Sequence, residues 1–257
     1  MDTLTYDRLC AEIVTQAELL RSHLAGADLT TPVPTCPGWN VGQLVRHVGG
    51  AHREAETVAR TREMPGEDDF RDPTHYAETD PVALGAWLVE GATALSDALR
   101  TAGSETPVPG PLPNGTVRFT ARRMTHETVM HRADAALALG VDYMLDRQVA
   151  LDAVDEWMEL GSLPIHFEVH PWMRELLGPG RTLHFHATDT DAEWVVDLTG
   201  DAIVWRRAHE KAAVAVRAPL LDLLLLIYKR RPAHGEGIEI IGDEQLLDFW
   251  LERVSFG

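Results

Sequence analysis

The chain has 257 residues, a length that suits two domains better than one. Hydrophobic residues make up 45% and charged residues 25%, which is the balance of a folded globular protein and not of a disordered one. Acidic residues outnumber basic residues by 40 to 23, and the net charge of -17 repels phosphate backbones, so we expect no nucleic-acid partner. Cys10 and Cys36 are the only cysteines, too few for a disulfide framework or a thiolate-rich metal site.

The N-terminal ten residues mix charged and apolar side chains and lack the apolar segment of a signal peptide. The longest apolar run, Leu220–Tyr228, is interrupted by Asp222 and is too short to span a bilayer. The sequence therefore predicts a cytoplasmic protein that does not associate with membranes.

Apolar residues at helical spacing predict five helices before residue 162, over about 4–25, 40–62, 81–102, 119–139 and 145–160. Asn40 should cap the second helix, Pro81 should open the third, and Gly140 should end the fourth. The acidic stretch 63–80 reads as an exposed loop, and the prolines of 103–115 exclude a regular helix there.

After residue 180 the apolar pattern alternates, which predicts short strands over 182–188, 193–198, 202–206, 212–217 and 237–241. An apolar helix should follow Pro219 as far as about Lys229, and Asp243 should cap a last helix. The fold class is thus α+β. The Gly- and Pro-rich stretch 161–180 places the boundary between a helical bundle of residues 1–162 and a mixed module of residues 175–257.

Two predicted helices of the bundle carry side chains that suit a metal ion. Glu127 and His131 are four residues apart, hence on one helix face, whereas His126 points away from His131. His47 borders the apolar stripe of the second helix. An ordinary Glu–His hydrogen bond and a core histidine would explain the same spacings. Together, two His and one Glu match the ligand set of catalytic zinc sites, which leave one coordination position open.

The same segments resemble the mycothiol-dependent maleylpyruvate isomerase family, whose N-terminal bundle is of the DinB-like metal-binding type. The resemblance rests on residues 35–41 (TCPGWNV), 44–47 (LVRH), 123–127 (RMTHE) and 131–135 (HRADA). Residues 220–232 and 241–244 resemble the family's C-terminal module, which is similar to sterol carrier proteins.

The resemblance implies that His47, Glu127 and His131 bind the metal. It also implies a functional arginine in the C-terminal module, which would be Arg230 or Arg231. A plain cationic helix end explains that pair equally well. Arg46, Arg132 and Asp134 are expected to be structural. Asp134 could orient a ligand, but a surface ion pair is the interpretation we favour for it.

Other candidate groups look structural. His184 and His186 would share one face of a strand, and His166 and His170 flank a short turn, but neither pair has an obvious third ligand. Cys36 precedes Pro37 in a turn without an adjacent base, so we expect it to be non-catalytic.

The resemblance predicts an enzyme that requires Zn²⁺ or another divalent metal, with mycothiol as cosubstrate. A zinc-bound thiolate would add to a small electrophile, giving either cis–trans isomerisation or S-transfer. Alternatives are a metal-dependent hydrolase using bound hydroxide and a non-catalytic metal-binding sensor. Beyond the thiol and the electrophile we expect no partner except a second copy of the chain, in a monomer or a homodimer.

Overall fold

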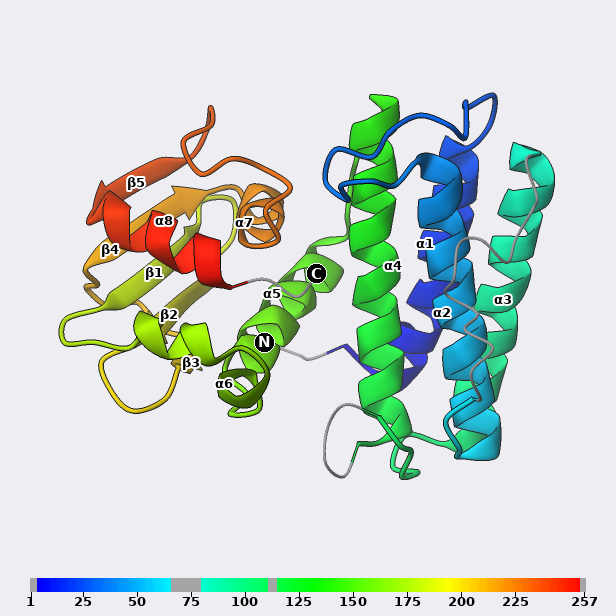
Figure 1. The fold of residues 1–257 in the computed structure, drawn as a ribbon, viewed down its shortest axis with the longest axis horizontal. Coiled ribbons are helices and arrows are strands. Elements are labelled where there is room, and N and C mark those ends of the chain that lie inside the picture. The colour runs from blue at the N-terminus through cyan, green and yellow to red at the C-terminus, as the bar shows by residue number, and fades with distance from the viewer. Residues whose placement is uncertain (1–3, 66–79, 111–114, 255–257) are drawn as a thin grey trace. The chain divides into compact units, whose positions relative to one another are not determined.

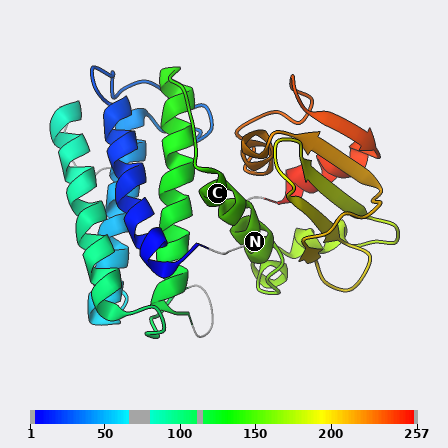
Figure 2. The same ribbon diagram turned by 180° about the vertical axis from the view of Figure 1, so that it is seen from behind.

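The computed structural model describes residues 4–65, 80–110 and 115–254. They divide into two compact units, residues 1–144 and 145–257 (Figures 1 and 2). Most of the loop expected at 63–80, and residues 111–114 of the proline-rich segment, lie outside the described residues. The α+β class is confirmed, because a helical unit precedes a unit built on one mixed sheet.

The first unit is a bundle of four long helices, α1 (Tyr6–His23), α2 (Val41–Thr61), α3 (Pro81–Ala102) and α4 (Val117–Leu139). The predicted end signals act as expected. Asn40 and Gln43 form a capping box at the start of α2, and Gly140 ends α4 in the left-handed conformation with φ 65°. Both α1 and α2 pack against α3 and α4, so the apolar stripes of all four helices meet in one core.

One helix among the described residues, α3, is long and apolar enough to pass a length-and-composition test for a membrane span, with a mean hydropathy of 1.2. Its packing gives another reason for this composition. Leu84, Leu88, Leu95 and Leu99 are at most 1% exposed and face the bundle core. A core helix of this kind is expected to be apolar.

The second unit begins earlier than the sequence suggested, because α5 (Arg147–Gly161) belongs to the same compact unit as the C-terminal sheet. Trp157 of α5 lies 5.1 Å from Trp250, measured between ring centroids. Asp155 accepts a 2.9 Å hydrogen bond from Trp194 Nε1 of the sheet. The boundary therefore lies at 144/145, and the extra helix that we assigned to the bundle belongs to the second unit.

The sheet has the strand order β3-β2-β1-β4-β5, in which β1 and β4 are parallel and the other neighbours are antiparallel. The strands follow the alternating pattern of the sequence closely, and two short helices lie in the expected linker, α6 (His166–Val169) and η2 (Pro171–Leu176). The remaining elements of the unit are β1 (Thr182–Ala187), β2 (Glu193–Asp197), β3 (Val204–Arg206), β4 (Val214–Ala218), α7 (Leu220–Ile227), β5 (Glu239–Gly242) and α8 (Glu244–Arg253).

Candidate functional site

Two neighbouring helices of the bundle bring His47, Glu127 and His131 together. His47 lies on α2, and Glu127 and His131 lie one helical turn apart on α4. Glu127 Oε1 is 3.2 Å from His47 Nε2 and 3.1 Å from His131 Nε2. The two imidazole rings meet edge-on, with centroids 5.0 Å apart. The carboxylate thus lies between the two imidazoles.

The donor atoms of these three side chains fit one metal ion. They all lie within 4.8 Å of one another. A tetrahedral ion about 2.0–2.2 Å from each N or O donor separates its donors by about 3.3 Å, which is close to the distances seen here. The side chains of His47, Glu127 and His131 are 20%, 25% and 13% exposed, so all three are partly accessible to solvent.

The charges around Glu127 fix its ionised form. Burial alone would raise the pKa of Glu127. Three basic neighbours instead hold that pKa well below its usual range: His131, His47, and Arg123 at 3.4 Å from Oε2. Burial acts to lower the pKa of His131, but the Glu127 and Asp134 carboxylates raise it well above its ordinary value. Without a metal, His131 is therefore a protonated partner of Glu127, and a metal ion would have to displace that proton.

Asp134 is not the surface residue that we favoured. It is completely buried, and its Oδ2 lies 2.9 Å from His131 Nδ1. Because Nδ1–H donates to this carboxylate, Nε2 is the ring nitrogen that faces Glu127, and it would bind a metal ion once its proton is displaced. Asp134 therefore orients His131 from the next turn of the same helix.

Cys36 also lies closer to the site than its sequence position suggested. Its Sγ is 3.4 Å from Asp134 Oδ2, beside the Nδ1 edge of His131. Glu127 and His47 lie on the opposite, Nε2 side of that ring. Because the two imidazole nitrogens point in divergent directions, Cys36 cannot readily share an ion with His131 Nε2.

Trp39 is a neighbour of the site that sequence reasoning missed. Its ring centroid lies 4.8 Å from that of His47 and 6.4 Å from that of His131. The residue belongs to the loop that carries Cys36 and ends at the Asn40 cap of α2. Its place in the motif at 35–41 was the one signal that could have revealed it.

Arg132 and His126 behave as expected, and a third bundle residue, His52, also lies outside the site. Arg132 is structural, since it donates to Gln16 Oε1 and to the carbonyl of Met144, both at 2.6 Å. His126 is fully buried and is not part of the three-residue cluster. His52 faces away from the site and lies 2.8 Å from Thr128 Oγ1.

The candidate residues of the second unit differ in the contacts that they make. Arg231 pairs with Asp222 at 2.7 Å, and Arg230 donates to the carbonyl of Tyr228, also at 2.7 Å. His166 and His170 stack with their ring centroids 6.0 Å apart at the short helix α6. The expectation that His184 and His186 lack a third ligand is wrong, because Glu193 and His209 lie beside them.

Replacing Asp134 by Asn should lower the metal affinity of the protein about 10- to 100-fold, the usual cost of losing a carboxylate behind a ligating histidine. The amide keeps the size of the side chain but removes the charge that favours the Nδ1–H form of His131. The affinity is measured by competition with a chromophoric chelator. Asp142→Asn, at an exposed position just beyond α4, is the control. Equal affinity in both variants would contradict the orienting role.

Fold and site together define a class of protein: a four-helix bundle carrying a two-His, one-Glu cluster, followed by an α+β unit. Family models agree with this division. The mycothiol maleylpyruvate isomerase N-terminal domain matches residues 10–136, and the C-terminal domain of the same isomerases matches residues 148–249. The chain belongs to the mycothiol maleylpyruvate isomerase family.

Two solved structures of the isomerase support the same fold. A crystal structure of the mycothiol-dependent maleylpyruvate isomerase matches with a TM-score of 0.64 and 15% identity, over 93% of this chain and 95% of that one. A histidine-to-alanine mutant of the isomerase gives a TM-score of 0.63 at the same identity and coverage. A ubiquinone synthesis protein, UbiJ-SCP2, covers 43% of this chain with a TM-score of only 0.30 and 13% identity. Among curated proteins, none matches the sequence.

Proposed function

We propose that this protein is a metal- and mycothiol-dependent enzyme that isomerises, or transfers the thiol to, a small electrophile at His47, Glu127 and His131. The observation that carries the proposal is the convergence of three donor atoms, within 4.8 Å, from two helices of a bundle in this family. Zinc is the metal that best suits two imidazoles and one carboxylate with an open fourth position.

The protein's own side chains prepare this site in three ways. Glu127 supplies the one negative charge among the three donors, so a divalent cation would keep a net positive charge. Asp134 orients His131, and Arg123 holds the other oxygen of Glu127. When bound, the cation would lower the pKa of an incoming thiol and so supply a nucleophile at neutral pH.

The protein offers no thiol of its own to the open position. Cys10 is completely buried in α1, and Cys36 lies on the Nδ1 side of His131, away from Glu127. An external thiol is therefore required, and family membership favours mycothiol. Trp39 flanks His47 and also lines a surface hollow of about 430 Å³, where the organic part of such a thiol could lie.

We also propose that a C-terminal arginine binds a carboxylate of the electrophile, as the resemblance implies for Arg230 or Arg231. Arg231 already neutralises Asp222 at 2.7 Å. Kinetics of Arg230→Met and Arg231→Met with a carboxylate-bearing substrate would assign the role. Unchanged kcat/KM in both variants would remove it from this pair.

The test of the proposed function is a titration of cobalt-substituted protein with mycothiol. We expect an intense charge-transfer band in the near ultraviolet, because sulfur is a soft donor that displaces water from such an ion. The band should be absent in Glu127→Ala. It should persist in Cys36→Ala, since the thiol that causes it comes from outside the chain.

Three outcomes would count against the proposal. A band that appears without mycothiol and disappears in Cys36→Ala would identify an internal thiol ligand. An unchanged spectrum at saturating thiol, with an ester still hydrolysed, would favour hydroxide chemistry. Cobalt binding without turnover of any electrophile would favour a sensor.

A further inference from the structure

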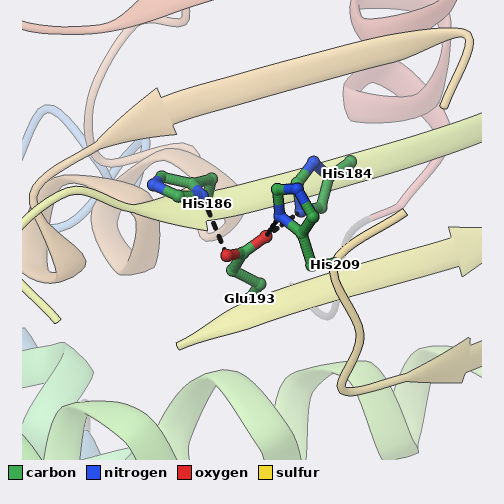
Figure 3. A group of neighbouring side chains, drawn as sticks. All are labelled: His184, His186, Glu193 and His209. Carbon is green, nitrogen blue, oxygen red and sulfur yellow. Dashed lines mark hydrogen bonds and ion pairs between the residues drawn. The ribbon is translucent and has the colours of Figure 1, made fainter. Parts of the chain in front are cut away.

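A second group of metal-ligand side chains lies on the sheet of the second unit. His184 and His186 belong to β1, Glu193 begins β2, and His209 lies in the segment between β3 and β4 (Figure 3). Each offers one donor atom, and these four atoms all lie within 4.8 Å of one another. We call these four residues the sheet cluster.

The strand register explains why three of the four side chains meet. Residues two apart on a strand share one face, so His184 and His186 point the same way while Phe185 packs into the core with Trp250. Glu193 is directly opposite His186 in the antiparallel β1–β2 pair, and it is the diagonal neighbour of His184. The sheet thus presents two imidazoles and one carboxylate as a unit.

His209 completes the sheet cluster from a distant part of the sequence. Its Nδ1 lies 2.6 Å from Glu193 Oε2, although the side chain is 81% exposed. The chain leaving β3 is already anchored by Arg207, whose guanidinium forms 2.8 Å hydrogen bonds with Asp155. His209 follows two residues later, so the anchored segment passes beside Glu193.

The side chains converge with their nitrogen atoms directed at the carboxylate. Glu193 Oε2 is 2.6 Å from His184 Nε2, and Glu193 Oε1 is 3.2 Å from His186 Nδ1. The three imidazole planes are inclined to one another by 69–84°, with centroids 5.6–6.4 Å apart, so none of these pairs stacks. Rings that share a metal ion must avoid stacking in this way, because each points one nitrogen at the centre.

We propose that the sheet cluster binds one divalent transition-metal ion, of the zinc class, through His184 Nε2, His186 Nδ1, Glu193 and His209 Nδ1. Imidazole and carboxylate donors suit zinc, and four protein ligands make a closed tetrahedral site, which is typical of a structural metal. The donors need only spread to about 3.3 Å to accommodate the ion. The site would join the segment between β3 and β4 to the β1–β2 pair.

The exposure of His209 favours a metal ion over hydrogen bonds alone. An exposed histidine paired with a carboxylate gains little stability, which hardly offsets the entropy lost on ordering its side chain. A shared ion would supply the missing stabilisation and would explain why an exposed ring faces Glu193.

The experiment uses the full chain with the substitutions His47→Ala and Glu127→Ala, which remove two of the three donors of the first site. After equilibration with micromolar zinc and gel filtration, elemental analysis should find about one zinc per chain. Adding His209→Ala should weaken zinc binding by ~100-fold or more. Replacing a residue that only hydrogen-bonds to a metal ligand typically lowers the affinity 10- to 100-fold. Because His209 is exposed, this substitution should leave the fold intact, as circular dichroism can verify.

His234→Ala provides the matched control, since His234 is an exposed histidine of the same unit that pairs with Asp248 outside the sheet cluster. This variant should retain the zinc.

Cobalt bound to the sheet cluster should give the strong visible absorption of tetrahedral coordination, and Glu193→Gln should weaken that absorption. No zinc in the parent protein, or equal zinc in the His209→Ala and His234→Ala proteins, would overturn the proposal. Neither result depends on the proposed function of the first site.

Discussion

Replacing Glu127 by Ala should remove the metal from the bundle and lower thiol-dependent turnover roughly 1,000-fold or more. This loss exceeds the 10- to 100-fold loss that is typical when a residue hydrogen-bonded to a metal ligand is replaced. Glu127 is the one anionic donor of the site, and its Oε1 lies within 3.2 Å of both ligand imidazoles. Without it, His47 and His131 would face a divalent cation with no balancing charge. Elemental analysis and steady-state kinetics measure the two effects.

A matched control is Glu90→Ala, because the Glu90 side chain is 80% exposed on α3 and lies 3.9 Å from Arg53. It should retain metal and activity. Chelation should lower the melting temperature of the control but not that of Glu127→Ala, since an ion that binds only the native state stabilises it by mass action. For this comparison both variants also carry a substitution of His209, so that metal bound at the sheet cluster does not affect the melting temperature. Full metal content and turnover in Glu127→Ala would eliminate the site.

Acidification should destabilise the metal-free protein through His52. This side chain is completely buried on α2, and burial lowers its pKa to about 3. Thr128 donates its hydroxyl hydrogen to the carbonyl of Met124, so its oxygen accepts from Nε2–H of His52. Among the described residues no partner faces Nδ1, and a proton added there would be buried without an acceptor.

The sign follows from the lowered pKa. Between pH 6.5 and 3 the unfolded chain binds a proton at His52 that the folded chain does not, so stability falls as the pH falls. The contribution of His52 to the free energy of unfolding is complete above pH 6.5. The free energy of unfolding is lower by about 2 kcal/mol at pH 5 and by on the order of 5 kcal/mol at pH 3. Urea unfolding at several pH values, with a chelator present, measures it.

The comparison is with His52→Leu, which keeps the position buried but cannot take up a proton. Thr128 keeps its bond to Met124 in this variant, so its hydroxyl is not left without a partner. Between pH 6.5 and 5 the free energy of unfolding should fall less steeply in His52→Leu than in the parent protein. His234→Leu, at an exposed histidine, should follow the parent. Identical slopes in all three proteins would show that His52 does not couple folding to pH.

The sequence determined the elements and the fold class, because these depend on local patterns. Helical spacing and end signals at Asn40, Gly140 and Asp243 located α2, α4 and α8, and period-two alternation located the strands. The spacing of Glu127 and His131 placed both on one face of a helix before any packing was known. The family motifs of residues 35–47 and 123–135 added His47 as the third member.

Tertiary structure decided what depends on contacts between distant segments. Helical periodicity shows that α5 has an apolar face, but not which core receives it, and Trp157 packs beside Trp250 in the second unit. Cys36 and Asp134 are 98 residues apart and meet beside His131. His209 reaches Glu193 only because the chain beyond β3 passes beside β2. Such contacts are set by strand register and helix packing, which local sequence patterns do not encode.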